Sequence, residues 1–289
     1  LSYIDALIKL DQLDDAKAVF DQAKSKGAKG DVLDQIEKQL YQTEKRQPDK
    51  KLFDNAIELR ESGKLHEAIV LLNDSLGAFL DDPNLLALLS HCYILDDRLT
   101  DAATYIDKAK EIDPDIALVG WNEARLLLKQ AKVGEALVVA KRANRTFPDD
   151  VEGMVVLGSC LRFNGDTDEA LEWYDKAINA DKKYAAAHYN KGVLLDKKLR
   201  PDEALKCLDD AITLDPKKDN PRFYKGIVLG KMKKHEEALN CFQNVYRNNR
   251  NHLDAYFQTG IQLAELGRHE QAVKVFDNIL KKYEKFRDN

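Results

Sequence analysis

Residues 185–195 read AAAHYNKGVLL, residues 219–229 read DNPRFYKGIVL and residues 253–263 read LDAYFQTGIQL, which is one pattern written three times. The stretches begin 34 residues apart, and each has an aromatic residue at its fifth position and Gly at its eighth. A fixed period of this length is typical of one supersecondary unit used repeatedly. The repeat therefore decides the fold.

The period extends over seven copies without an insertion. Position 20 of every copy is alanine, and the seven are Ala68, Ala102, Ala136, Ala170, Ala204, Ala238 and Ala272. Position 8 is also small in every copy. The register predicts seven units, which are 49–82, 83–116, 117–150, 151–184, 185–218, 219–252 and 253–286.

Each unit reads as two amphipathic helices joined by a short polar turn, such as NGDTD at 164–168 or ELGRH at 265–269. Small residues at positions 8 and 20 let the two backbones approach closely, and larger neighbours fill the gap. One such pair cannot bury its apolar face alone, so the units must stack. The sequence predicts an all-α solenoid of antiparallel helix pairs.

The pattern resembles the tetratricopeptide repeat (TPR) family. The small residue at position 8, the Ala at position 20, the large residue at position 24 and the Pro at the end of several units carry this resemblance. It covers residues 49–286. The resemblance implies a right-handed superhelix whose first helices line a concave groove.

The N-terminal residues depart from this register. Residues 1–30 are expected to form a partial TPR-like helix pair, with Ala16 and Phe20 at positions 20 and 24. Ala68 then follows 52 residues after Ala16, which is 18 more than one period. The surplus predicts an extra helix and a linker over 31–48.

Composition excludes several classes of function. The net charge of −5 argues against nucleic-acid binding. No apolar run approaches the length that a membrane span needs, and no leader is visible, so we expect a cytoplasmic protein. The cysteines show no CxxC spacing and are expected to be buried free thiols; they are Cys92, Cys160, Cys207 and Cys241.

No enzyme activity is expected. The chain has no GxSxG, P-loop, HExxH or GxGxxG motif. His235 and His269 occupy the same position of consecutive units, so the repeat explains them and no metal site or cofactor is predicted.

The position-5 aromatics are the first candidates for binding a partner. In the family this position faces the groove, and Trp121, Tyr189 and Phe223 are the favoured anchors. Two interpretations stay open, because the rings could contact a partner or pack on the neighbouring helix. Phe53 and Phe257 complete the set.

Amides recur at position 6 in alternate units, as Asn122, Asn190 and Gln258. An amide can clamp an extended peptide backbone, as the asparagine ladder of the TPR region of O-linked N-acetylglucosamine transferases does, or be satisfied by its neighbours. The remaining groove candidates are Arg125, Lys197, Tyr224 and Lys231.

Chaperone-binding members of the family grip an acidic tail with a carboxylate clamp. Around Asn190 the matching positions hold Val155, Ser159, Asn220 and Tyr224, and around Asn122 they hold Ala87, His91, Glu152 and Val156. Neither set supplies the required lysines, so we expect no binding to heat-shock chaperones.

The sequence favours a non-catalytic scaffold that binds a peptide or helix of a partner protein in its groove. One alternative is the substrate-recruiting arm of a larger bacterial transferase. The missing initial Met and a resemblance of residues 2–40 to the start of some bacterial TPR proteins with transferase domains motivate it.

The other alternative is a self-assembling solenoid. Residues 49–181 hold 26 acidic and 15 basic residues, whereas 182–250 hold 9 acidic and 16 basic residues. Opposite charges could join two copies. The solenoid ends could also associate, because an apolar stripe continues down the last helix through Phe276, Leu280, Tyr283 and Phe286.

Overall fold

The computed structural model describes residues 3, 4, 7, 13–26, 30, 33, 36, 50–76 and 82–287. Within these ranges every regular element is a helix and no strand occurs. The prediction of an all-α helical repeat solenoid is confirmed.

The chain divides into two compact units, Leu1–Asn122 and Glu123–Asn289, and the division falls inside α8 (Ala117–Lys129). The first unit also holds α2 (Leu13–Ser25), α4 (Lys50–Glu61), α5 (Leu65–Leu76), α6 (Pro83–Leu95) and α7 (Leu99–Ile112). The second holds α9 (Val133–Thr146), α10 (Val151–Asn164), α11 (Thr167–Ala180), α12 (Ala185–Lys197), α13 (Pro201–Leu214), α14 (Asp219–Lys231), α15 (His235–Asn248), α16 (Leu253–Glu265) and α17 (His269–Arg287).

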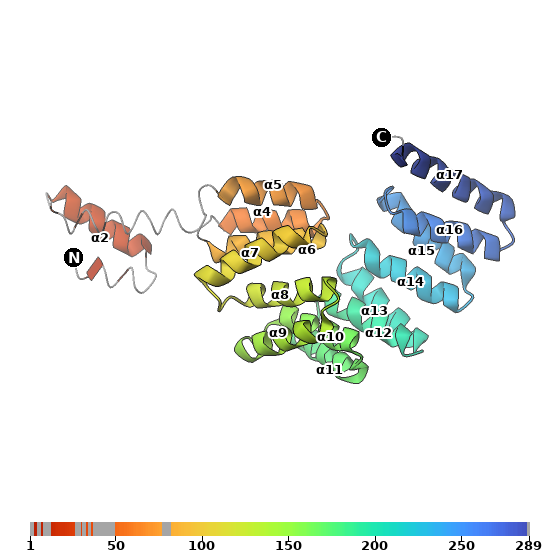
Figure 1. The fold of residues 1–289 in the computed structure, drawn as a ribbon, viewed down its shortest axis with the longest axis horizontal. Coiled ribbons are helices and arrows are strands. Elements are labelled where there is room, and N and C mark those ends of the chain that lie inside the picture. Colours follow the sequence, from red (N-terminus) through yellow and green to blue (C-terminus); the bar gives the residue numbers. More distant parts are fainter. Residues whose placement is uncertain are drawn as a thin grey trace. The chain divides into compact units, whose positions relative to one another are not determined.

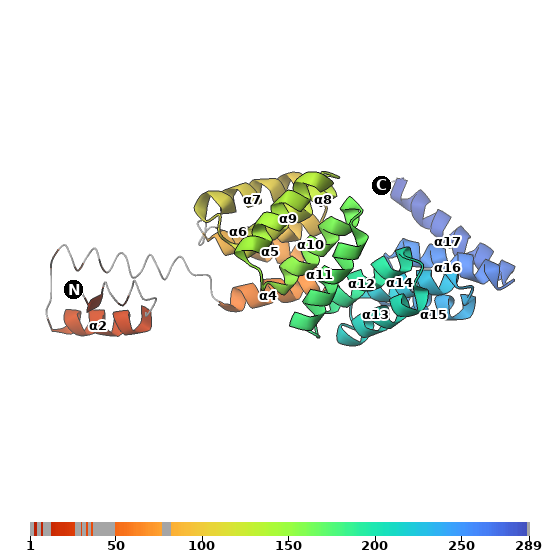
Figure 2. The same ribbon diagram turned by 90° about the horizontal axis from the view of Figure 1, so that it is seen from below.

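Helices pack as consecutive pairs inside each unit (Figures 1 and 2). In the first unit α4 packs on α5 and α6 on α7, and α5 also contacts α6. In the second unit α10 to α17 form four such pairs. The second helices α11, α13 and α15 each contact the first helix of the next pair, so the apolar faces are buried by stacking.

The small residues at positions 8 and 20 hold the paired helices close together. A Cβ added at Gly226 would lie 2.7 Å from the Phe242 ring, and one at Gly260 would lie 2.6 Å from the Phe276 ring. Ala238, the small residue at position 20 on the other helix of the pair, is 0% exposed. Glycine at position 8 is therefore required by the ring at position 24.

The turn inside each unit uses one left-handed residue at position 15. Gly165 has φ of 99° there, and Leu199 has φ of 57° at the same position of the next unit. Asp166 N then donates to Leu161 O, which closes the helix end. The other left-handed residues of this position are Gly63, Asp97, Ala131, Lys233 and Gly267.

The N-terminal segment has a small apolar cluster of its own. Ala16 and Phe20, predicted at positions 20 and 24 of a partial unit, are buried together with Leu33 and Ile36. The rest of the predicted helix and linker over 31–48 lies outside the described residues.

Candidate functional site

The first helices of the second unit form the predicted binding surface. α12 contacts α10 and α14 as well as its own partner α13. We call this side the groove face and define it by positions 5, 6, 9, 12 and 13 of α10, α12, α14 and α16.

Two of the position-5 rings, Phe223 and Phe257, pack on the second helix of their own unit. The centroids of Phe223 and Phe242 are 5.5 Å apart, and those of Phe257 and Phe276 are also 5.5 Å apart. Because Phe242 and Phe276 also press on the glycines at position 8, the aromatic and the Gly of one unit hold the same ring between them. In these two units, this contact explains why an aromatic residue stands three positions before the Gly.

Several of the predicted anchor rings contact other rings of the chain. Phe223 also lies 4.9 Å from the His252 ring, and Tyr189 meets the edge of Tyr224 at 5.8 Å between centroids. Burial raises the pKa of Tyr189 to about 12. Phe257 keeps 48% of its surface exposed and remains open to a partner, while Phe53 is half-buried.

Trp121, one of the favoured anchors, does not stand open in the groove. Its side chain is 1% exposed and is among the largest fully buried side chains of the described residues. The indole is a core group.

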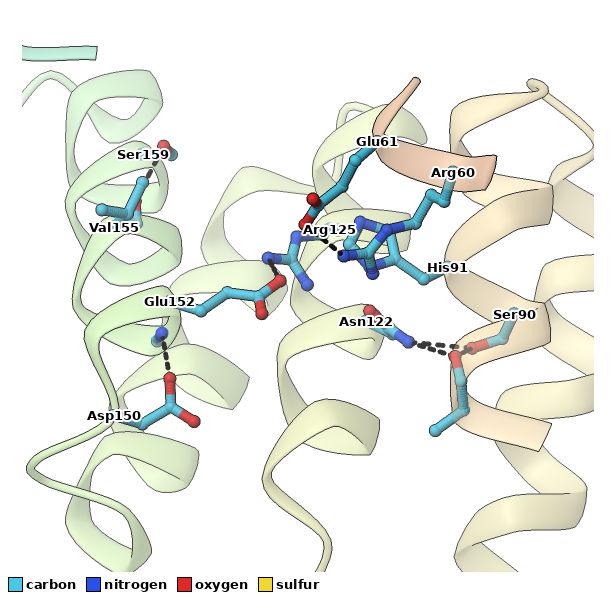
Figure 3. A network of polar contacts seen from close by, with 12 residues as sticks. Arg60, Glu61, Ser90, His91, Asn122, Arg125, Asp150, Glu152, Val155 and Ser159 are labelled. Carbon is cyan, nitrogen blue, oxygen red and sulfur yellow. Dashed lines mark hydrogen bonds and ion pairs between the residues drawn. The ribbon is translucent and has the colours of Figure 1, made fainter. Parts of the chain in front are cut away.

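Asn122 fills a structural role in the first unit. Its Nδ2 donates to Ala87 O at 2.7 Å and to Ser90 Oγ at 3.0 Å, and the residue is 0% exposed (Figure 3). The amide thereby ties α8 to α6. Of the two interpretations of the position-6 amides, satisfaction by neighbours applies to Asn122.

The other two amides belong to the second unit. Asn190 Nδ2 donates to Ala186 O at 2.8 Å within α12, which occupies one of its donors. Gln258 is half-buried and lines a cleft on the groove face.

Two of the predicted cations are joined to carboxylates. Arg125 pairs with Glu152 at 2.5 Å, as Figure 3 shows. Lys231 Nζ lies 2.6 Å from Asp196 Oδ2, and the Asp196 side chain is only 7% exposed. Both pairs join neighbouring first helices. Lys197 is exposed.

A cleft of about 530 Å³ opens on the groove face between α14 and α16. Ile227 and Ile261, both at position 9, give it apolar walls. The predicted residues Lys231 and Gln258 line it together. Two predicted site residues from different helices thus meet at one cavity.

The cleft also contains His235 and Gln262, which the sequence did not place among the candidate binding residues. His235 Nδ1 is 3.0 Å from Gln262 Oε1, and the Gln262 amide lies over Gly230. The repetition of Ile at position 9 in two consecutive units was a usable signal. Gln262 at position 10 carried none, because this position belongs to the core side in the expected pattern.

Two of the four thiols, Cys92 and Cys160, are buried as expected. Burial raises the pKa of Cys92 to about 11 and that of Cys160 to about 12. Cys207 and Cys241 are half-buried, and burial raises their pKa values as well. Among the described residues no three His, Cys, Asp or Glu side chains gather as a metal site would require. Within the same residues, no helix combines the length and apolar character of a bilayer span.

Family profiles match most of the region with the 34-residue period. A profile described as TPR repeat matches residues 158–198, and one described as Tetratricopeptide repeat matches 185–218. A second Tetratricopeptide repeat profile matches 53–115 and 225–285. Residues 2–27 match a profile described as PPR repeat.

One curated relative is the TPR repeat-containing protein MJ0940 of Methanocaldococcus jannaschii. It is 28% identical over 112 residues, which are 38% of this chain and 35% of that protein. The chain thus matches about a third of the length of this relative.

Solved structures share the fold. The thermophilic TPR protein TTC0263 of Thermus thermophilus aligns with a TM-score of 0.58 and 21% identity, over 63% of this chain and 99% of that one. A chain of the APC/C hetero-tetramer Cut9–Hcn1 aligns with a TM-score of 0.71 and 14% identity, over 86% of this chain and 49% of that one. The seven sequence copies of the 34-residue pattern, the paired helices and these matches together show that the chain belongs to the tetratricopeptide repeat family.

Proposed function

We propose that this chain is a non-catalytic scaffold that binds a peptide or helix of a partner protein on the groove face of its second unit. TPR folds generally serve protein–protein interaction. The observation that carries the proposal is the cleft between α14 and α16, which combines apolar walls with polar groups that can fix a backbone.

Apolar and polar residues of the cleft would contact different groups of the partner. Ile227 and Ile261 offer an apolar surface for one anchor side chain of the partner. Phe257 lies one turn before Ile261 on α16 and is half exposed, so it extends this surface. At the same cleft, the Gln258 amide can both accept hydrogen bonds from the bound segment and donate them to it, and the Lys231 ammonium can donate them.

A displayed library of random peptides, selected on the immobilised chain, tests the proposal. We expect enriched peptides to bind the wild type and to lose at least about tenfold in affinity against the variant Ile261→Glu, since a carboxylate would stand on the apolar wall. Lys206→Gln, an exposed change on α13, is the control and should bind as the wild type does. Peptides that bind the Ile261→Glu variant equally well would refute the groove as the site.

A specific observation favours self-association as a second candidate. Leu239, at position 21, is 4% exposed because it packs with Leu263 of the following α16. The equivalent residue of α17, Val273, is 56% exposed, and Leu280, two turns further on, is 61% exposed. Two such faces from two copies could cover each other.

Light scattering across protein concentration tests this candidate. The wild type should gain mass with concentration, and Leu280→Glu should remain at the mass of one chain, because a charge on this face cannot be buried cheaply. A wild type that stays a monomer at every concentration removes the candidate.

A further inference from the structure

A second cleft lies on the other side of α16. It measures about 480 Å³ and is bounded by α15, α16 and α17. From α16 it takes Tyr256, Thr259 and Leu263, which at 100° per residue lie on the opposite side of the helix from Gln258 and Ile261. The two clefts are therefore separate surfaces.

One link between repeats that occurs at the two preceding junctions is absent at the second cleft. In the two preceding junctions, Lys at position 7 of a first helix pairs with Asp at position 25 of the unit before it. The pairs are Lys191 with Asp175 and Lys225 with Asp209, each at 2.5 Å.

At the junction of α15 with α16 these two positions hold Gln243 and Thr259. Both line the cleft, and the Thr259 hydroxyl donates to Ala255 O within its own helix. Position 25 thus lacks the carboxylate that it has in the two units before, and position 7 lacks the long side chain.

The charged side chains that line the cleft are all of one sign. Among the described residues that line it, Arg247, Arg250 and Lys274 are basic and none is acidic. Arg247 and Lys274 are exposed and come from different helices, α15 and α17. One guanidinium nitrogen of Arg247 donates to Asn244 Oδ1 at 3.1 Å, and this contact orients the planar fork that carries its other donors.

Aromatic rings form one flank of the cleft. Tyr246 and Tyr256 stack with 4.1 Å between centroids and 7° between planes. The Arg250 guanidinium lies 5.0 Å from the Tyr246 centroid, and Asn278 Nδ2 donates to Tyr256 Oη at 3.1 Å. These contacts fix the flank, so the cleft can receive a ligand without rearranging it.

We propose that this cleft is a second docking site, which binds an acidic polypeptide segment of a partner protein. One carboxylate of the segment lies in the cleft beside Gln243 and Thr259, where the ion pair of the preceding junctions is absent. Arg247 and Lys274 bind further carboxylates from two sides, which suits acidic residues spaced along an extended chain better than a single compact anion. The proposal does not depend on the groove face.

Fluorescence anisotropy of a labelled hexaglutamate peptide tests this site on the full chain. We expect binding that weakens as salt rises, and no binding of a labelled hexaglutamine peptide. Arg247→Gln with Lys274→Gln should weaken hexaglutamate binding by about tenfold or more. Lys206→Gln with Lys217→Gln removes the same charge from exposed positions outside the cleft and should change the affinity less than about twofold.

A second variant separates the cleft from the overall charge. Gln243→Asp with Thr259→Lys restores the ion pair of the preceding repeats and leaves the net charge unchanged. We expect this variant to fill the cleft and to lose hexaglutamate binding as fully as Arg247→Gln with Lys274→Gln does. A thermal melt should show that all variants are folded.

Three results would overturn the proposal. The first is equal weakening in the cleft variant and in the variant Lys206→Gln with Lys217→Gln. The second is full binding by the chain with the restored ion pair. The third is no hexaglutamate binding by the wild type. If the chain then self-associates and Arg247→Gln with Lys274→Gln abolishes this, the occupant is a second copy of this chain.

Discussion

The Nζ of Lys231 lies 2.6 Å from the Oδ2 of Asp196, and this ion pair links α14 to α12 on the groove face. The two side chains differ in environment, because Lys231 is 59% exposed and Asp196 is 7% exposed. The carboxylate is thus a nearly buried charge whose cation reaches it from the solvent. Such a carboxylate depends on its partner more than an exposed one does.

Loss of the ammonium should therefore cost stability. We expect Lys231→Met to lower the free energy of unfolding by about 1–2 kcal/mol, since it leaves Asp196 with less compensation. Lys197→Met is the matched control, because Lys197 has the same position in the preceding unit and is exposed. Urea unfolding of both variants measures the difference, and equal costs would show that the pair contributes nothing.

The close approach of Gly226 to Phe242 gives a second prediction. We expect Gly226→Ala to destabilise the chain by about 1–3 kcal/mol, because the new Cβ would lie 2.7 Å from the ring. Gly134→Ala on α9 is the control and should be neutral or stabilising, since its Cβ would meet nothing within 4 Å.

Relief of the same contact should restore stability. Phe242→Leu introduces the residue that faces the equivalent glycine, Gly192, at position 24 of the preceding unit. Gly226→Ala should therefore cost less in a Phe242→Leu background than alone. A cost that is the same in both backgrounds would mean that the ring is not what requires glycine.

The repeating fold could be predicted because the period constrains positions that pack inside one unit. Ala238 and Gly226 show this, since their small size is dictated by a helix only a few residues away in the chain. A period read from the sequence reports such contacts directly. The all-α repeat architecture followed from it.

The candidate site could be predicted less well from the repeat period. Position 5 lies between the groove and the second helix, so the pattern could not decide that Trp121 is buried while Phe257 is half exposed. The pairing of Lys231 with Asp196 depends on the register between neighbouring units, 35 residues apart. The cleft beside Gln243 lies where Gln and Thr replace the Asp and Lys of the preceding repeats. A period read from the sequence does not report such a local difference.

The buried thiols predict a pH dependence. Burial raises the pKa of Cys160 to about 12, whereas a thiol in the unfolded chain has a pKa of about 8.5. Both states keep the proton below the lower value, so this contribution to stability is fully present there. As pH rises further the unfolded chain releases the proton first, and stability falls until the folded thiol also titrates.

Urea unfolding between about pH 8 and about pH 10 checks this prediction. The wild type should lose up to about 1.4 kcal/mol per pH unit for each such thiol, and Cys160→Ala should show a shallower slope. Identical slopes in both chains would contradict a buried, protonated Cys160.

The shared turn geometry of Gly165 and Leu199 leads to opposite effects of substitution. Leu199 adopts φ of 57° although a side chain disfavours this region, and it is 88% exposed, so its removal loses little packing. We expect Leu199→Gly to stabilise the chain by about 1 kcal/mol and Gly165→Ala to destabilise it by a similar amount. Thermal unfolding midpoints of the two variants measure this. If Leu199→Gly lowered the midpoint instead, the entropy that glycine adds to the unfolded chain would outweigh the relief of strain in the turn, and the prediction would be wrong.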